Sequence, residues 1–303
     1  MNKLPEDYAT FFPQLRGALK RVALQRGEQS VTTLYRRVST ATDVKFPMYL
    51  VPLDQLHRLY GGKEPRYYRI EAHQELKRRG ELVRWEDLPF DANIIFLSHE
   101  WVGWSHPDPH GIQLKTFLRV MERLRLGLIS RVDMNYHHAM MFKTNHVVQA
   151  EEWEEILRTA YVWIDWASMP QPSACPPSVS QDKKNKIGTD LGNAVKSIPA
   201  YVEKADFVTI VAPGCLHADR RDSESKNRAR ICYRTYRNRG WCVLEMFASY
   251  LSRDKQHPAL LITSREGMPE WVLPLEIQKL AVGTSDFTCC QRNHIFGGRV
   301  VRK

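Results

Sequence analysis

The chain has 303 residues, of which 43% are hydrophobic and 10% aromatic, and its formal net charge is +10. This composition supports a sizeable core and excludes an intrinsically disordered protein. No apolar stretch approaches the roughly 20 residues that span a bilayer, and the N-terminus has no apolar signal sequence. The six cysteines lack the spacing of a disulfide framework. We therefore expect a cytoplasmic protein with reduced thiols and no membrane span.

Residues 1–90 form a basic flank that we expect to be largely helical, because apolar residues between Tyr68 and Leu82 recur with partly helical spacing. The segment FPMYLVPL is apolar but contains Pro47 and Pro52, so it is predicted to be extended. Nothing in this flank indicates chemistry.

The pattern changes at Asp91, where an α/β domain is predicted to begin and to run to residue 264. Ile94 to Leu97 form a continuous apolar run, which is typical of a strand buried on both faces of a parallel sheet, and Ser98 follows it. Three later runs have the same character: residues 161–164, which end at Asp165, residues 207–211, which Pro213–Gly214 close, and residues 259–262.

Helical patterns separate these strands. Apolar residues at positions i, i+3, i+4, i+7 and i+10 predict a helix with one buried stripe: Leu114, Phe117, Leu118, Met121 and Leu124. Residues 170–189 are predicted to be a long polar loop, and residues 194–205 a helix that is kinked or begins at Pro199. A last helix opens after Gly240. This alternation predicts an α/β fold with an open parallel sheet and helices on both faces, followed by a C-terminal extension over 265–303.

Ligands of such sheets bind outside the carboxyl ends of the strands, which here are Ser98–His99, Asp165–Trp166 and Pro213–Gly214. The sequence has neither a GxGxxG nor a Walker A motif, which disfavours an ordinary dinucleotide-binding domain or a P-loop NTPase.

Glu245 is the strongest candidate for a functional residue. In a helix it lies one turn after Trp241 and Cys242, so a carboxylate shares a largely apolar face with an indole. In a partly dry cleft such a carboxylate has a raised pKa or stabilises a developing cation. The alternative is a structural ion pair with a preceding arginine such as Arg239, and the composition favours neither interpretation.

Two tryptophans, Trp101 and Trp104, lie in the loop after the first strand. They either stack on a flat ligand ring or, more commonly, cover the edge of the core. Asp165 either caps the loop that follows it or faces the ligand. A Ser98–His99–Asp165 triad is disfavoured, because adjacent residues of a strand point to opposite faces.

Metal sites have weak support. His99, Glu100, His106 and Asp108 lack the HExxH spacing of zinc peptidases, and His and Asp are common in loops for hydrogen-bonding reasons. Cys289, Cys290 and His294 form half of a metal knuckle whose partner pair is missing.

The segment from Arg220 to Arg239 contains eight basic residues. It is either a solvated, mobile loop or a cationic rim that attracts a phosphate-bearing ligand. No zinc-finger, homeodomain or RNP pattern is present, so nucleic acid is a disfavoured partner.

Four segments, in this order, resemble motifs of the TIR (Toll/interleukin-1 receptor) family. IIFLSHEW is similar to the first TIR strand, and VWIDWASMP to the second strand with its terminal aspartate. AVKSIPAYVEKADFVTIVAPGCL resembles the following helix and third strand, and GWCVLEMF the W-C-x-x-E motif. The segment WIDWASMPQ is also weakly similar to fungal heterokaryon-incompatibility domains.

This resemblance implies a TIR/flavodoxin-like fold, with NAD⁺ as a substrate rather than a bound cofactor, and no metal. Glu245 matches the glutamate that NAD-cleaving TIR domains use. The residues that we assign to substrate binding are Ser98, His99, Trp101, Trp104, Asp165, Arg239, Trp241 and Cys242.

Two functions follow from the resemblance. The first is an NAD⁺ nucleosidase acting in signalling or innate immunity, which releases nicotinamide and ADP-ribose or a cyclic product and becomes active when it self-associates. The second is a non-catalytic signalling adaptor that binds itself or other TIR-like domains through residues 170–189. A nucleic-acid binder that depends on residues 220–239 is the least favoured.

Overall fold

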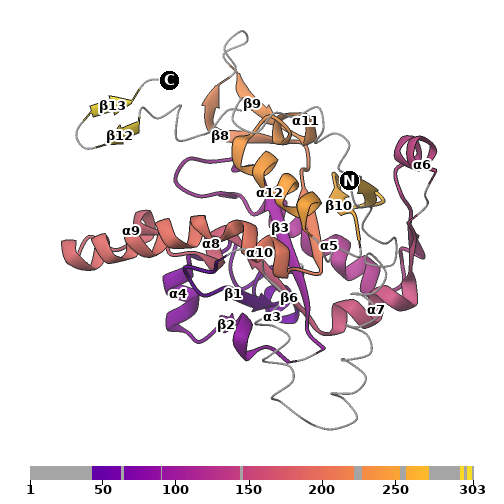
Figure 1. Ribbon diagram of the computed structural model, residues 1–303, viewed down its shortest axis with the longest axis horizontal. Coiled ribbons are helices and arrows are strands. Elements are labelled where there is room, and N and C mark those ends of the chain that lie inside the picture. The colour runs from indigo at the N-terminus through magenta and orange to yellow at the C-terminus, as the bar shows by residue number, and fades with distance from the viewer. Residues whose placement is uncertain are drawn as a thin grey trace, which may run out of the picture.

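The computed structural model describes residues 43–62, 65–89, 91–143, 146–221, 227–252 and 257–272, and the short stretches 294–296 and 299–301. A seven-stranded sheet with the order β11-β10-β7-β3-β6-β1-β2 forms its centre (Figure 1). The four central strands are parallel: β3 (Asn93–His99), β6 (Ala160–Ile164), β7 (Phe207–Val211) and β10 (Ala259–Ile262). Three strands pair antiparallel with their neighbours: β1 (Tyr49–Pro52), which lies beside β6, and the two edge strands β2 (Val83–Arg84) and β11 (Glu270–Val272).

The parallel strands lie side by side as β6, β3, β7 and β10, which are second, first, third and fourth along the chain. The direction of strand addition therefore reverses next to β3, the flavodoxin-like arrangement, in which ligands bind at the reversal point. The predicted α/β class with an open, mostly parallel sheet is confirmed.

Helices cover both faces of the sheet, because alternate residues of β3 point to opposite sides. Ile95 and Leu97 pack with α3 (Leu53–Tyr60), α5 (Ile112–Arg125) and α7 (Ala150–Arg158). Ile94 and Phe96 pack on the other side with α10 (Ile198–Lys204) and the end of α9 (Gln181–Lys196), where Ala248 of α12 (Gly240–Leu251) also contacts the core. All five residues of the predicted apolar stripe in α5 are buried.

The sheet extends beyond the predicted domain limits. Before Asp91, β1 pairs with β6, and after residue 264, β11 pairs with β10. The segment FPMYLVPL contains β1 and is extended, as predicted. The described part of the flank also contains α4 (His73–Arg78) and the short helical turn Trp85–Asp87, so it combines helices with sheet strands.

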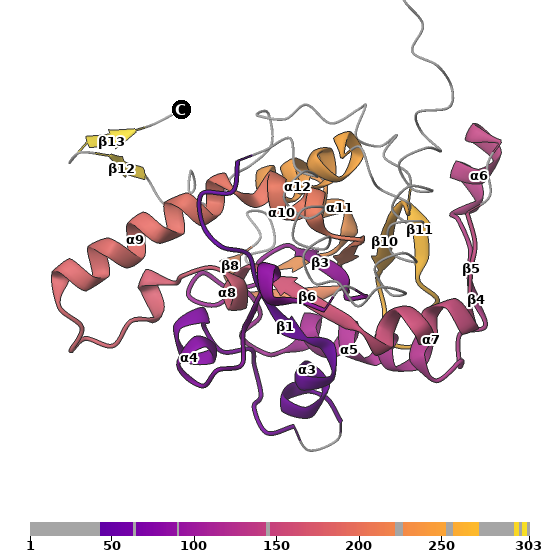
Figure 2. The same ribbon diagram turned by 60° about the horizontal axis from the view of Figure 1, so that its bottom comes forward.

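The predicted polar loop over 170–189 is wrong in its second half, because α9 begins at Gln181. The first six residues of α9 are all polar, so the helix shows no apolar stripe there, although no proline prevents it from forming. From this end α9 extends away from the sheet into solvent (Figure 2). The loop itself is the shorter stretch that holds the turn Pro172–Ala174. The helical direction changes at Ser197, between α9 and α10, and Pro199 lies in the first turn of α10, as predicted.

Smaller elements complete the structure. The described residues of the basic segment form regular elements, which the interpretation as a mobile loop does not include: β8 (Cys215–Arg221) pairs with β9 (Arg228–Ile231), and α11 (Tyr233–Tyr236) follows. A second ribbon of β4 (Arg131–Val132) and β5 (Val148–Gln149) carries α6 (Tyr136–Phe142) away from the sheet (Figure 2). The remaining elements are α8 (Asp165–Ser168) and a hairpin of β12 (His294–Phe296) and β13 (Arg299–Val301).

No helix within the described residues is long and apolar enough to cross a membrane. Cys289 and Cys290 of the half-knuckle lie outside the described residues, as does the side chain of His294.

Candidate functional site

The carboxyl end of β3 places three polar residues in succession. Ser98 and Glu100 point toward α11 and α12, where they meet Tyr236 and Arg239. His99 points to the opposite face, toward α5 and α8. Two polar clusters therefore lie back to back at the point where the strand order reverses.

Glu245 forms the centre of the first cluster. Its Oε2 accepts a short hydrogen bond from Ser98 Oγ, and Tyr236 Oη lies 2.6 Å from the same Ser98 oxygen. Because a serine hydroxyl has one proton and donates it to Glu245, Tyr236 must donate to Ser98. The result is a directed chain of donors from tyrosine through serine to carboxylate, with Glu245 only 8% exposed.

The electrostatics of this chain favour a neutral acid. Burial raises the pKa of Glu245 to about 8, with a smaller upward effect from Asp165, and it outweighs the hydrogen bond from Ser98 and the attraction of His99. Burial also raises the pKa of Tyr236, so this phenol stays a donor. Glu245 is thus mostly protonated at neutral pH and becomes a carboxylate within one or two pH units, which is typical of functional groups.

The predicted alternative, an ion pair between Glu245 and Arg239, is not what the structure has. Arg239 Nε instead lies 3.6 Å from Glu100 Oε1, and both side chains are buried. Among the described residues Glu245 has no ion-pair partner. Burial raises the pKa of Glu100, opposed by a hydrogen bond from Thr235 and by Arg239, and its Oε2 has no hydrogen-bond partner.

His99 forms the centre of the second cluster. Its Nδ1 lies 2.7 Å from Gln113 Oε1, and its Nε2 lies 3.2 Å from Asp165 Oδ1. Gln113 is oriented by its own amide, which donates to the Glu100 carbonyl at 2.9 Å. Both ring nitrogens of His99 face acceptors, so the ring binds best as a doubly protonated cation.

The pKa values agree with this geometry. Burial by itself lowers the pKa of His99, but the charge of Asp165 and the two hydrogen bonds outweigh it and raise the pKa to about 9. For Asp165, burial raises the pKa, whereas His99 and the Trp101 indole, whose Nε1 donates to Oδ2 at 2.6 Å, lower it overall. Asp165 is therefore an ionised partner within the cluster.

The predicted tryptophans differ in their surroundings. Trp101 is half-buried, donates to Asp165 and packs edge-on against Trp166, so it covers the edge of the core. Trp104 is 42% exposed and lies edge-on to His217, while its backbone N–H donates to Asp219. Trp241, in the first turn of α12, is 38% exposed. Trp104 and Trp241 are the indoles that a ligand can reach.

Cys242 is buried beside Glu245, and its thiol lies 3.6 Å from the His99 carbonyl oxygen. Burial raises the pKa of this thiol well above its usual range, so it remains a weak donor and not a nucleophile.

The loop after β3 uses its other polar residues for structure. Asp108 accepts from the backbone N–H groups of Ile112 and Leu114 and so caps α5. His106 Nε2 donates to the Ile70 carbonyl, and its Nδ1 accepts from the Asp108 N–H. His106 and Asp108 are therefore engaged away from His99, and the described residues contain no group of three or more potential metal ligands. Nor do Ser98 and His99 form a triad with Asp165, because Ser98 faces Glu245.

Sequence reasoning missed Tyr236 and Gln113. Tyr236 lies within the basic segment, where charge dominates the pattern. Gln113 follows the start of a helix, a position at which a polar residue usually faces solvent. Only the tertiary structure brings Tyr236 and Gln113 to residues 138 and 14 positions away, respectively.

Comparison of the chain with models of protein families, with curated proteins and with solved structures finds no match.

Proposed function

We propose that the chain is a TIR-like NAD⁺ nucleosidase with Glu245 as its catalytic carboxylate. The observation that carries the proposal is a buried glutamate with a raised pKa, held by Ser98 at the carboxyl end of a central parallel strand. This is the edge of the sheet at which open α/β folds bind their ligands. The motif resemblance, with Glu245 at the family's glutamate, supplies the substrate.

The reaction requires little from the protein beyond a placed negative charge. The bond between the ribose C1′ and the nicotinamide nitrogen breaks, and its electron pair goes to the ring, which leaves as neutral nicotinamide. The sugar becomes an oxocarbenium ion, which an ionised Glu245 stabilises. Water, or a nucleophile of the same molecule, then adds at C1′ and releases a proton. Because the leaving group is already cationic, no general acid is needed.

The remaining predicted residues fit a dinucleotide in this proposal. The exposed indoles of Trp104 and Trp241 offer faces for the ring systems. Arg239 is the buried cation nearest in sequence to Glu245, and it binds a pyrophosphate only by giving up its contact with Glu100. His99 and Asp165 hold the opposite face of the strand end in place.

In this proposal the single chain is expected to have a low basal activity. Glu245 is 8% exposed and mostly protonated at neutral pH. The cationic ring of bound NAD⁺ favours the ionised carboxylate, and assembly through residues 170–189, as the resemblance implies, is then the step that opens the site.

The test is to incubate the full chain with NAD⁺ at high protein concentration with a crowding agent and to follow nicotinamide release by chromatography. Glu245→Gln is expected to lower the rate by at least about a hundredfold, because the amide cannot carry the stabilising charge. Glu154→Gln, an exposed change on α7, is the matched control and keeps the wild-type rate. No release by the wild-type chain under these conditions contradicts the proposal.

A specific feature of α9 favours the adaptor as the second candidate. Leu191 and Val195 pack against the core, whereas Ile187, one turn earlier on the same stripe, is half-buried and is not among the residues of that core. An apolar residue in that place suits contact with another subunit. An adaptor loses self-association, measured by light scattering, in Ile187→Asp and keeps it in Glu245→Gln. An enzyme activated by assembly loses turnover in both variants.

A further inference from the structure

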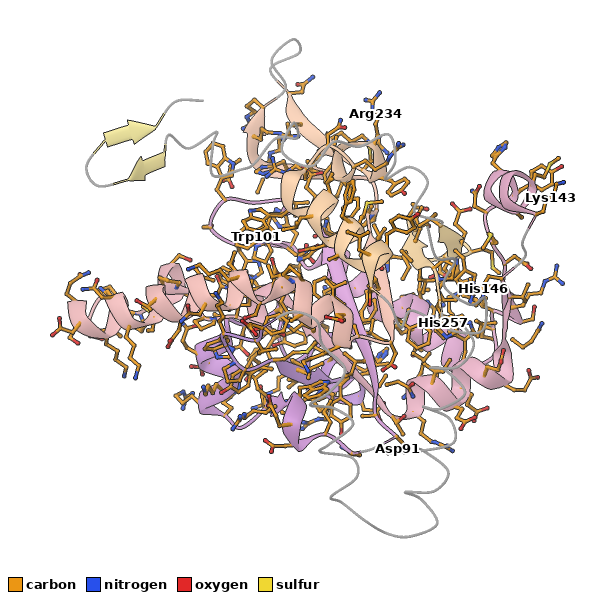
Figure 3. All side chains as sticks on the ribbon, viewed as in Figure 1. Asp91, Trp101, Lys143, His146, Arg234 and His257 are labelled. Carbon is orange, nitrogen blue, oxygen red and sulfur yellow. The ribbon has the colours of Figure 1, made fainter. Side chains whose placement is uncertain are left out.

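Two histidines that are far apart in the sequence meet at a distance from the candidate site. His146 precedes β5 and His257 precedes β10, yet His146 Nε2 lies 2.9 Å from His257 Nδ1. Their ring planes are inclined by 65°. Figure 3 shows the pair well away from Trp101, which marks the candidate site. None of the chemistry proposed above uses them.

Aromatic side chains hold both rings in place. The His257 ring stacks on Phe207 at 4.5 Å and lies nearly parallel to Trp271 at 5.6 Å, while His146 meets the edge of Trp271 at 5.0 Å. Trp271 in turn stacks on the buried Trp153. These contacts fix the directions of the two facing nitrogens, so the pair is preorganised before any ligand arrives.

The same surroundings favour the neutral form of the His146 imidazole. Burial lowers the pKa of His146, with a smaller opposing effect from Glu152. In a pair of neutral histidines one nitrogen donates its proton to the lone pair of the other. One lone pair and one N–H therefore face each other, and a cation takes the place of the shared proton when the donor ring holds its proton on its other nitrogen.

The geometry suits a metal ion that prefers nitrogen ligands. A tetrahedral zinc ion with Zn–N bonds of about 2.0–2.1 Å places two ligand nitrogens about 3.3 Å apart. The two rings need to separate by only about 0.4 Å to admit it. Both histidines are half-buried and keep some contact with solvent, so water can reach the remaining coordination positions.

We propose that His146 and His257 form a binding site for a divalent transition metal of the zinc, nickel or copper class, with water completing the coordination. Neutral imidazoles suit these metals, whereas Mg²⁺ and Ca²⁺ require oxygen ligands. The described residues offer no third protein ligand in a group, so the site binds more weakly than a closed structural zinc site. Bound metal ties the chain before β10 to the chain before β5 and steadies that side of the sheet.

The experiment is a calorimetric titration of the full reduced chain with ZnCl₂ and separately with NiCl₂, with MgCl₂ as the negative control. The wild-type chain is expected to bind one more equivalent of Zn²⁺ or Ni²⁺ than His146→Gln or His257→Gln. His110→Gln, an exposed histidine elsewhere, is the matched control and retains the wild-type stoichiometry. Equal stoichiometry in all four chains overturns the proposal, and so does binding of Mg²⁺ at the same site.

A second measurement needs no variant and remains decisive if a substitution prevents folding. Amide hydrogen exchange of the wild-type chain, with and without ZnCl₂, is expected to slow in residues 146–149 and 257–262 together. Slowing confined to other segments, such as those with cysteines, shows that the metal binds elsewhere and overturns the proposal.

Discussion

The two polar clusters at the end of β3 begin at neighbouring residues and reach opposite charge states. On one face, Glu245 is surrounded by hydroxyl donors and a thiol, and burial keeps it a neutral acid. On the other face, burial disfavours the charge on His99 in the same way, yet the Asp165 carboxylate keeps it a cation. The difference shows that the partner, and not the degree of burial, decides whether a group at this edge is charged.

The largest expected effect tests the neutral acid. Because the folded-state pKa of Glu245 lies above its unfolded value, the native state binds the extra proton, and this group lowers stability as pH rises from about 4.5 to about 8. Gln has no such cost. The free energy of unfolding of Glu245→Gln, minus that of the wild type, should therefore increase by about 1.4 kcal/mol per pH unit between pH 5 and 8. Urea unfolding at several pH values measures this, and a pH-independent difference contradicts the raised pKa.

The next effect tests the ion pair on the other face. Asp165→Asn removes the carboxylate that keeps His99 charged and should cost about 2–3 kcal/mol of stability at pH 6. The folded-state pKa of His99 is raised, so its contribution is complete below about pH 6.5 and is lost as pH rises through about 9. The Asp165→Asn penalty should therefore shrink above pH 9. The double variant His99→Gln/Asp165→Asn checks the coupling. If its loss of unfolding free energy equals the sum of the losses in the two single variants, the two residues are not coupled.

A third prediction concerns activity and depends on the proposed nucleosidase. If ionised Glu245 is required, kcat/KM should rise about tenfold per pH unit below a midpoint near 8 and fall as His99 loses its proton near 9. The rise in kcat should occur at lower pH, because the bound pyridinium cation favours the carboxylate. Initial rates of nicotinamide release give both profiles, and a flat profile between pH 6 and 8 rules out this role for Glu245.

The smallest effect concerns Tyr236. Tyr236→Phe removes the donor to Ser98 and should cost about 1 kcal/mol of stability. Without the hydrogen bond from Tyr236, Ser98 becomes a weaker donor to Glu245, so the pKa of Glu245 should rise further. The midpoint of the pH profile of kcat/KM should then move to higher pH. Tyr250→Phe, on the exposed side of α12, is the control and should change neither quantity. A loss of stability without a shift in the profile would leave Tyr236 with a packing role only.

Strong periodic patterns predicted the central fold well. The run from Ile94 to Leu97 is uniformly apolar, and a short run of this kind is typical of a strand buried on both faces of a sheet. The apolar stripe of α5 extends over five residues at helical spacing, which predicts a helix with one buried face. The pattern failed where an element was short or polar. Strand β11 has three residues, and the first half of α9 contains only one large apolar residue, Ile187, so neither carries a clear hydrophobic signature.

The site was predicted in part for the same reason. Glu245 was evident because a carboxylate interrupts an apolar helix. The partner of Arg239 could not be predicted, because Glu100 directly follows β3 and also lies near this arginine. Which of the two carboxylates pairs with Arg239 depends on distances that a sequence does not contain. The role of Trp101 as a donor to Asp165 was hidden in the same way.

The antiparallel pairing of β1 with β6 has a practical consequence for truncation of the chain. A fragment that starts at Asp91 would lose β1 and leave the backbone of Val162 without its strand partner, on an edge whose side chains are apolar. Bare apolar edges pair with other chains and aggregate. The loss would also remove the contacts of His73 with the Ala167 carbonyl and of Gln74 with Gln171, which support the segment directly after Asp165. A soluble fragment should therefore keep β1 together with Phe46, whose carbonyl accepts from Tyr201 Oη, and should end no earlier than Val272.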